Sequence, residues 1–229
     1  MKKVMALAVA CVALVAQSAF AVSAIRISQA YGGGGSASPG PTYNQDYVEI
    51  YNSSSYAVEI SNWTIEYGSA TGNWGSSSSN IFTFPSPTHI PACSYILVAL
   101  GTPSAGGGAL PITPDYTGTL AMSATNGKVA LFNAVNTNLA CGSELAGTLQ
   151  DKLAYGTGNC PEGTAIAALS TTTGAVRNTG GAADTDNNAA DFTIVTNPVP
   201  RNSASPLNPG CVVIGVETST WSTIKTLFQ

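Results

Sequence analysis

Short apolar runs alternate with polar residues along most of the chain, and Gly, Ser, Thr, Asn and Pro interrupt them at intervals of about ten residues. In residues 46–52, DYVEIYN, a two-residue period places Tyr47, Glu49 and Tyr51 on one face and Val48 and Ile50 on the other. No window of about twelve residues carries a 3.6-residue apolar period before the C-terminus. The pattern predicts an all-β sandwich of short strands.

The expected strands lie within residues 24–31, 46–52, 57–69, 80–84, 94–100, 118–123, 127–133, 175–178 and 191–195.

The last residues follow a different pattern. A Pro, Ser and Asn-rich linker precedes residues 216–229, in which spacings of three and four place apolar side chains on one side of a short helix. These side chains are Trp221, Ile224, Leu227 and Phe228. Two interpretations stay open, namely a tail that frays or packs on the sandwich and a docking or sorting tag with an apolar binding face.

The first 21 residues have the features of a secretory signal. Lys2 and Lys3 precede an apolar core, and Ala19 and Ala21 form a small-x-small pattern before the expected cleavage site. A lipoprotein signal ending at Cys11 is the alternative, with an apolar core of only about seven residues. No later segment approaches about 20 continuous apolar residues, so we expect no transmembrane segment after signal removal. The expected organisation is a signal at 1–21, one domain at 22–206, and a linker with a tail at 207–229.

The charge balance argues against nucleic acid as a partner. Removal of Lys2 and Lys3 leaves six basic and twelve acidic residues, and the basic residues do not cluster. Phosphate backbones are bound mainly through groups of Lys and Arg. We therefore expect a protein or a surface polysaccharide as the partner instead.

Four cysteines remain after cleavage. Their even number in an exported chain favours disulfides, and the sequence has no CxxC pair to suggest a metal site. Three pairings exist. Cys141 and Cys160 bracket one connection and are the favoured pair, which leaves Cys93 with Cys211.

The chain supplies few groups for catalysis. His89 is the single histidine, and no serine stands in a G-x-S-x-G motif. Paired carboxylates are the remaining route, and the sequence does not show which of them face one another. The candidates are Asp46, Glu49, Glu59, Glu66, Asp115, Asp151, Asp184, Asp186 and Asp191. Because Glu49, Glu59 and Glu66 alternate with apolar residues, we expect them to face solvent. We predict no catalytic residues, no cofactor and no enzyme activity.

Residues 184–192, DTDNNAADF, have an unusual density of carboxylates and amides. Asp184, Asp186 and Asn188 match the opening of an EF-hand loop, but Ala189 replaces its glycine and Val195 its final glutamate. A weak calcium site of another geometry, with Asp184, Asp186 and Asn188 as ligands, is the alternative. The favoured interpretation is an Asx turn before a strand, with Asp184 accepting backbone hydrogen bonds.

Aromatic residues concentrate in the first third of the domain. Exposed rings of Tyr47, Tyr51 and Trp74 would form a ligand surface able to stack on sugars, which is the basis of a carbohydrate-binding alternative. The competing interpretation is that these rings are core or strand-pair residues, because aromatic side chains favour half-buried positions in sheets.

Several segments together resemble the lamin tail domain family, specifically its bacterial secreted members. They are RISQAYGGGG, DYVEIYNSSSYAVEISNWTIEY, GKVALFN, AVRN with DTDNNAADFTI, and PRNSASP, in family order over residues 25–206. The resemblance implies an immunoglobulin-like β-sandwich without catalytic residues. It also implies a non-catalytic binding or scaffolding module, secreted or at the cell surface. A carbohydrate-binding module, or an accessory module of a secreted nuclease or hydrolase, is the alternative function.

Overall fold

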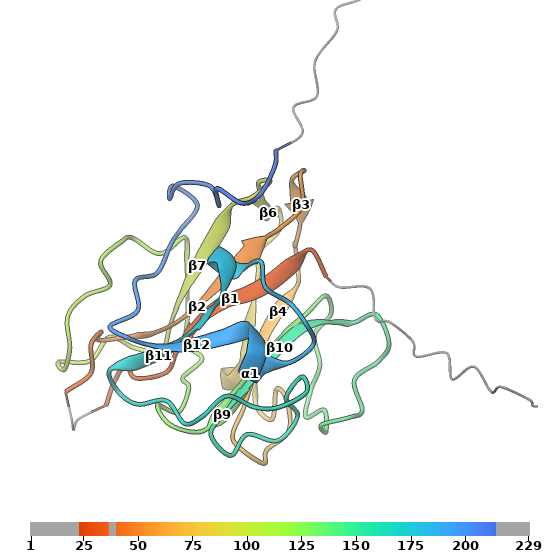
Figure 1. The fold of residues 1–229 in the computed structure, drawn as a ribbon. Coiled ribbons are helices and arrows are strands. Elements are labelled where there is room, and N and C mark those ends of the chain that lie inside the picture. Colours follow the sequence, from red (N-terminus) through yellow and green to blue (C-terminus); the bar gives the residue numbers. More distant parts are fainter. Residues whose placement is uncertain (1–22, 37–39, 214–229) are drawn as a thin grey trace, which may run out of the picture.

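The chain folds as two β-sheets packed face to face, in an immunoglobulin-like sandwich (Figure 1). The computed structural model describes residues 23–36 and 40–213. The larger sheet has six strands in the order β12-β11-β1-β2-β7-β8, all antiparallel except the pair β7 and β8. These strands are β1 (Ile25–Tyr31), β2 (Asp46–Asn52), β7 (Tyr95–Leu100), β8 (Tyr116–Gly118), β11 (Thr173–Arg177) and β12 (Phe192–Thr196).

The smaller sheet has four antiparallel strands in the order β10-β9-β4-β5. A two-stranded ribbon of β3 and β6 lies at one end of the molecule (Figure 1). The strands are β3 (Val58–Glu59), β4 (Thr64–Gly68), β5 (Ile81–Thr83), β6 (His89–Ile90), β9 (Gly127–Phe132) and β10 (Leu149–Tyr155). The short helices are α1 (Asn188–Asp191) and the 3-10 turns η1 (Ser78–Asn80) and η2 (Thr179–Gly181). No helix among the described residues is long and apolar enough to span a membrane.

Alternate residues of the central strands build the core between the sheets. Val48 and Ile50 of β2 and Val98 of β7 are fully buried in one apolar cluster with Val129 and Leu131 of β9. This is the apolar face that period two predicts, and its burial supplies the main favourable free energy of folding.

The opposite face of the larger sheet is covered as well, which the alternation of polar and apolar residues does not reveal. Tyr47 and Leu97 pack there with Tyr31 and Tyr43 in a second apolar cluster. The Tyr43 hydroxyl donates to the Pro198 carbonyl at 2.8 Å, so the chain beyond β12 forms part of this covering layer.

Glu49 and Glu66 are therefore not the solvent-facing carboxylates expected from the sequence, since both side chains are fully buried. Glu49 is bound by Arg201, whose Nη2 lies 2.6 Å from Oε1 and whose backbone N–H donates to Oε2. The Glu66 carboxylate accepts the backbone N–H of Asn136 at 2.7 Å. The expectation fails because distant segments cover both faces; Glu59, in contrast, is exposed.

The strand positions expected from the sequence mostly match the observed ones, with local differences. The 57–69 stretch is not one strand, because a turn with a positive φ at Asn62 separates β3 from β4. Residues 119–123 do not form a strand; β8 ends at Gly118. The strands β6 and β10 were not expected. The β10 sequence, LQDKLAY, contains three successive polar residues with a buried Asp151 at their centre, and these interrupt the alternation.

Two disulfides are present, Cys93–Cys211 and Cys141–Cys160, in the pairing that the sequence favours. Cys93–Cys211 fastens the end of the described chain beside β7, where the Asn208 N–H also donates to the Cys93 carbonyl at 3.1 Å. The expected signal at 1–21 lies outside the described residues. The expected tail face of Trp221, Ile224, Leu227 and Phe228 lies outside them too.

Replacement of Cys93 and Cys211 by serine is expected to lower the free energy of unfolding by about 3–5 kcal/mol, because the bridge closes a long loop. Its two cysteines are 118 residues apart, against 19 for Cys141 and Cys160. Urea unfolding of both double variants measures this, with a smaller loss expected for the Cys141 and Cys160 pair. An unchanged urea midpoint in the Cys93→Ser/Cys211→Ser variant would contradict the prediction.

Candidate functional site

The DTDNNAADF segment forms the turn and short helix α1 that lead into β12. The Asn187 side chain caps α1 by accepting the Ala189 N–H at 3.2 Å. Asp191 closes the turn, since its carboxylate accepts the Thr185 N–H and hydroxyl, each at 2.9 Å. The Asx-turn interpretation is right in kind, but Asp191 and Asn187 make the backbone hydrogen bonds instead of Asp184.

Asn188 closes the outer edge of β10. Its Oδ1 accepts the Ala154 N–H at 3.0 Å and its Nδ2 donates to the Lys152 carbonyl at 2.9 Å, as a neighbouring strand would. Its Oδ1 also accepts the Glu162 N–H at 3.2 Å. A buried amide side chain thus satisfies backbone groups at the edge of the smaller sheet.

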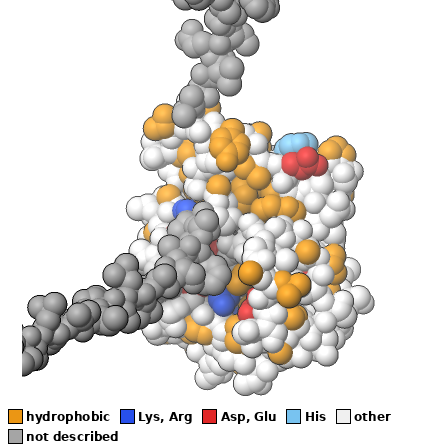
Figure 2. Space-filling view, turned by 90° about the vertical axis from the view of Figure 1, so that its right-hand side faces the viewer, with side chains coloured by type: hydrophobic (Ala, Val, Ile, Leu, Met, Phe, Trp, Pro, Cys, Tyr) orange, Lys and Arg blue, Asp and Glu red, His pale blue; other side chains and the backbone are white. Residues whose placement is uncertain are grey.

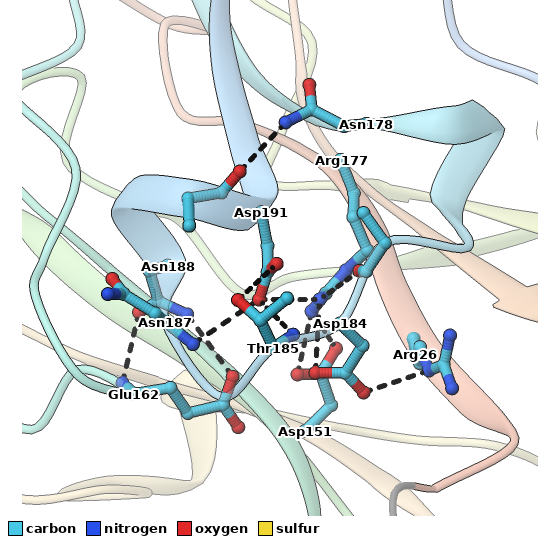
Figure 3. A network of polar contacts seen from close by, with 12 residues as sticks. Arg26, Asp151, Glu162, Arg177, Asn178, Asp184, Thr185, Asn187, Asn188 and Asp191 are labelled. Atoms are coloured by element: carbon cyan, nitrogen blue, oxygen red, sulfur yellow. Dashed lines mark hydrogen bonds and ion pairs between the residues drawn. The ribbon is translucent and has the colours of Figure 1, made fainter.

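A fully buried arginine, Arg177 at the end of β11, lies at the centre of this region (Figure 3). Its Nη2 is 2.8 and 2.6 Å from the two carboxylate oxygens of Asp151 in β10. Its Nε donates to the Ile27 carbonyl in β1 at 2.8 Å, and its Nη1 to the Ala183 carbonyl at 2.9 Å. The guanidinium carbon lies 4.3 Å from the centroid of the Phe192 ring. One side chain therefore joins both sheets to the turn.

The ionisation of this pair follows from its contacts. Burial raises the pKa of Asp151, and the charge of Arg177 together with the Ile27 N–H acts against that rise. Burial lowers the pKa of Arg177, whereas the charges of Asp151, Asp184 and Glu162 raise it. The raising effect is larger, so the pKa of Arg177 lies above its usual value. A guanidinium nitrogen that donates to both oxygens of one carboxylate favours the charged form of both partners.

Asp184 takes part in the same network as an ion-pair partner. Its Oδ2 is 3.0 Å from Arg26 Nε, and its Oδ1 is 3.7 Å from Arg177 Nη1 (Figure 3). The two arginines explain why position 184 is an aspartate. Because both Asp184 oxygens face arginines, they do not accept the backbone hydrogen bonds expected from the sequence.

The calcium alternative is not supported by this arrangement. Asn188 Oδ1 is engaged with two backbone N–H groups, and the Asp184 carboxylate with Arg26. Within the described ranges, the acidic residues of 184–191 do not form a group of three whose oxygens lie near enough to share one ion. Cys141, Glu144 and Cys160 do form such a group, but their sulfurs are joined in a disulfide and are not thiolate ligands.

A groove of about 850 Å³ runs beside this network. The walls come from the segments 142–150 and 161–163, with Lys152, Asp184, Asp186 and Ser23 completing the lining. The Cys141–Cys160 disulfide joins the two walls at their ends. The network around Arg177 and Asn188 holds the β10 side in place. The groove is the candidate functional site, because concave, partly apolar surfaces with a few polar groups are the usual binding sites of proteins.

Glu162 is the most perturbed acid of the groove. Burial, with the charges of Asp151 and Asp184, raises its pKa to about 9. The charges of Arg177 and Lys152 act in the opposite direction. The Glu162 carboxyl is therefore protonated at neutral pH, with Asn188 Nδ2 3.3 Å from its Oε2.

The alternative of an exposed aromatic ligand surface is wrong, and the rings are core or strand-pair residues. Tyr47, Tyr51 and Trp74 are each fully buried. Tyr51 stacks on Tyr95 with ring centroids 4.9 Å apart, and the Trp74 ring packs against Phe132 on the outer face of the smaller sheet. The rings are buried because loops cover both outer faces, so the interpretation as core residues applies.

The groove residues Glu144, Glu162 and Lys152 were not identified from the sequence. Glu144 and Glu162 stand in Gly-rich loops without a recognisable motif, at residues 142–147 and 156–163. The sequence feature that could have identified Glu144 and Glu162 is their position beside Cys141 and Cys160, because an expected disulfide brings its flanking residues together. His89 lies elsewhere, on β6, with its Nε2 3.9 Å from Glu59 Oε2, and both side chains are largely exposed.

Most basic side chains of the described residues are engaged within the fold. Arg26, Arg177 and Arg201 form ion pairs, and Lys128 Nζ donates to the Gly72 carbonyl and to Asn159 Oδ1. Figure 2 shows one face of the molecule, on which the few visible Lys and Arg side chains do not gather into a patch.

Comparison with known proteins identifies relatives by family and by fold. The family model described as Lamin Tail Domain matches residues 18–191. A crystal structure of a DUF4876 family protein from Bacteroides thetaiotaomicron is similar at a TM-score of 0.55 and 14% identity. The match covers 83% of this chain and 75% of that one, and at this identity it shows the fold alone. Among curated proteins, none matches the chain.

Arg177→Met is expected to lower the free energy of unfolding by about 3–5 kcal/mol, because it leaves the buried Asp151 carboxyl without its cationic partner. The double variant Arg177→Met/Asp151→Asn is expected to lose less, since asparagine removes that carboxyl group and still accepts the Ile27 N–H. Urea unfolding measures both, with Lys152→Met as a control expected within about 0.5 kcal/mol of the original. The single variant Asp151→Asn completes the cycle, and a double variant whose loss equals the sum of the Arg177→Met and Asp151→Asn losses would contradict a specific ion pair.

Glu162→Gln is expected to weaken the pH dependence of stability. Because the pKa of Glu162 is raised from 4.5 to about 9 in the folded chain, its contribution is fully present below pH 4.5 and is lost as the pH rises through about 9. The original chain should therefore lose stability from pH 5 to pH 9, and the variant should lose less. Urea unfolding at pH 5, 7 and 9 tests this, with the exposed Glu59→Gln as control. Equal slopes for the original chain and Glu162→Gln would refute it.

Proposed function

We propose that this chain, which belongs to the lamin tail domain family, is an exported, non-catalytic module. It binds a protein partner, and the binding site is the groove. The observation that carries the proposal is a preformed groove whose walls are fixed by a disulfide and by the Arg177 network. A rigid scaffold with an open groove binds without the entropy cost of ordering loops.

Two of the four acids of the groove, Asp184 and Glu144, are engaged within the fold, which supports binding over hydrolysis. Hydrolysis by paired carboxyl groups needs a proton donor and an ionised partner on opposite sides of the scissile bond. In the groove, Asp184 is held by Arg26 at 3.0 Å, and Glu144 Oε1 accepts the Trp74 Nε1–H at 2.8 Å. Both carboxylates thus have structural partners that would compete with a substrate.

The two disulfides support an extracellular or cell-surface location. Disulfides persist in oxidising compartments and are rare in the cytosol of mesophilic cells. Cys93–Cys211 and Cys141–Cys160 together stabilise the chain end and the groove, so the proposed binding site depends on an oxidised environment.

A protein partner is favoured over a polysaccharide because the described lining of the groove contains no aromatic ring. Sugar-binding surfaces stack exposed aromatic rings on the sugar face. Tyr47, Tyr51 and Trp74 are buried, whereas the groove offers aliphatic side chains and carboxylates. This composition is closer to a peptide-binding groove.

A matched pair of tryptophan variants tests the proposal. Ala146→Trp fills the groove at an exposed position, and Val199→Trp places the same side chain at a 67% exposed position outside the groove lining. Cross-linking to host envelope and supernatant proteins, with the partner identified by mass spectrometry, should give one specific partner. We expect that partner to be lost in Ala146→Trp and retained in Val199→Trp.

Equal cross-linking by both tryptophan variants would exclude the groove as the binding site. Hydrolysis of a polysaccharide, peptide or nucleic acid by the pure chain, abolished by Glu162→Gln, would overturn the non-catalytic assignment.

A further inference from the structure

The groove combines aliphatic surface with more carboxyl groups than basic groups. Its aliphatic lining consists of Leu145, Ala146, Leu149 and Pro161. Four carboxyl groups and one ammonium group also line it, namely Glu144, Glu162, Asp184, Asp186 and Lys152. Charge of one sign on a partly apolar wall attracts ligands of the opposite sign.

The negative charge is not fully compensated by the chain itself. Asp184 is paired with Arg26, but among the described residues neither Asp186 nor Glu162 forms an ion pair. Asp186 is exposed at the mouth of the groove, at a turn position with a positive φ of 55°. A cation entering the groove would therefore meet Asp186 and Glu162 as carboxyl groups that form no ion pair within the described chain.

We propose that the groove binds a lysine or arginine side chain presented by an extended segment of the protein partner, an inference that rests on the function proposed above. Lysine and arginine place long aliphatic stems along apolar surface while their charged ends reach polar groups. Leu145 and Leu149 suit the stem, and Asp186 and Glu162 suit the charged end.

A cationic side chain fits the groove better than a metal ion or an anionic ligand. Hard cations require several converging oxygens, and the acidic side chains of the groove do not form a group of three with oxygens close together in the described part of the chain. A volume of about 850 Å³ also exceeds the needs of one ion. Anionic ligands would meet repulsion from the same carboxylates.

Glu162 makes the binding of a cation sensitive to pH. The groups that act on its carboxyl are Asp151, Asp184, Arg177 and Lys152, and together with burial they keep it protonated at neutral pH. A bound cation favours the ionised form, so binding releases a proton and strengthens as the pH rises. Lysine stays charged over this range, because its usual pKa is about 10.4.

The test uses the purified chain and three peptides, acetyl-Ala-Leu-X-Leu-Ala-amide with Lys, Gln or Glu at X. NMR titration follows the amide signals of Gly142, Gly147 and Gly163, which line the groove. The Lys peptide is expected to bind about tenfold more tightly than the Gln peptide at pH 8, and the Glu peptide more weakly than both. Its affinity should rise at least about threefold from pH 6 to pH 9.

The variants separate charge from shape. Glu162→Gln and Asp186→Asn should each lower the affinity for the Lys peptide by about three- to tenfold and leave the Gln peptide unchanged. Glu162→Gln should also flatten the pH profile, while Val199→Trp should behave as the original chain. Equal affinities for the Lys and Gln peptides, or no binding of any peptide, would overturn this inference. The proposed function would then still stand if Ala146→Trp abolished cross-linking to the partner.

Discussion

The buried ion pair of Arg177 and Asp151 is the interaction on which the rest of the structure depends. Arg177 contacts β1 through the Ile27 carbonyl, β10 through Asp151, and the turn before α1 through the Ala183 carbonyl. A buried charge is tolerated only when its partners are all in place, because an unpaired charge loses its hydration without compensation. The two sheets and the turn must therefore assemble together, and the groove beside β10 acquires its shape from that assembly.

The same rule governs the outer face of the larger sheet. Arg201 binds Glu49 with Nη2 2.6 Å from Oε1, and its guanidinium lies over the Tyr95 ring at 3.8 Å. This contact fastens the chain beyond β12 across β2 and β7, where Cys93–Cys211 then secures it. Because the arginines of the described chain are paired with buried carboxylates, Lys152 is the one basic side chain that lines the groove beside its four carboxyl groups. The scarcity of basic residues thus links the stability of the fold to the character of its surface.

Much of the fold was predictable, and the candidate site was not. Short alternating or apolar runs bounded by turn residues located β1, β2, β7 and β9, and alternate residues of these strands build the core between the sheets. The pattern missed β10, where a buried aspartate stands between Gln150 and Lys152. It also favoured Asp184 as the turn residue, although Asp191 accepts the backbone hydrogen bonds. Spacing identifies a turn but does not distinguish between neighbouring carboxylates, since each finds its partner in a distant strand.

The sequence by itself determined the strand-rich architecture, the favoured disulfide pairing and the resemblance to the lamin tail domain family, because each rests on local pattern or on residue identity. The tertiary structure alone decided which polar residues are buried. Alternation shows that Tyr47, Glu49 and Tyr51 share a face, but the residues that cover that face come from beyond β12. The groove has the same origin, since residues 142–150, 161–163 and 184–186 meet only when the sandwich closes. Burial and charge compensation are properties of such long-range contacts, and no short segment contains them.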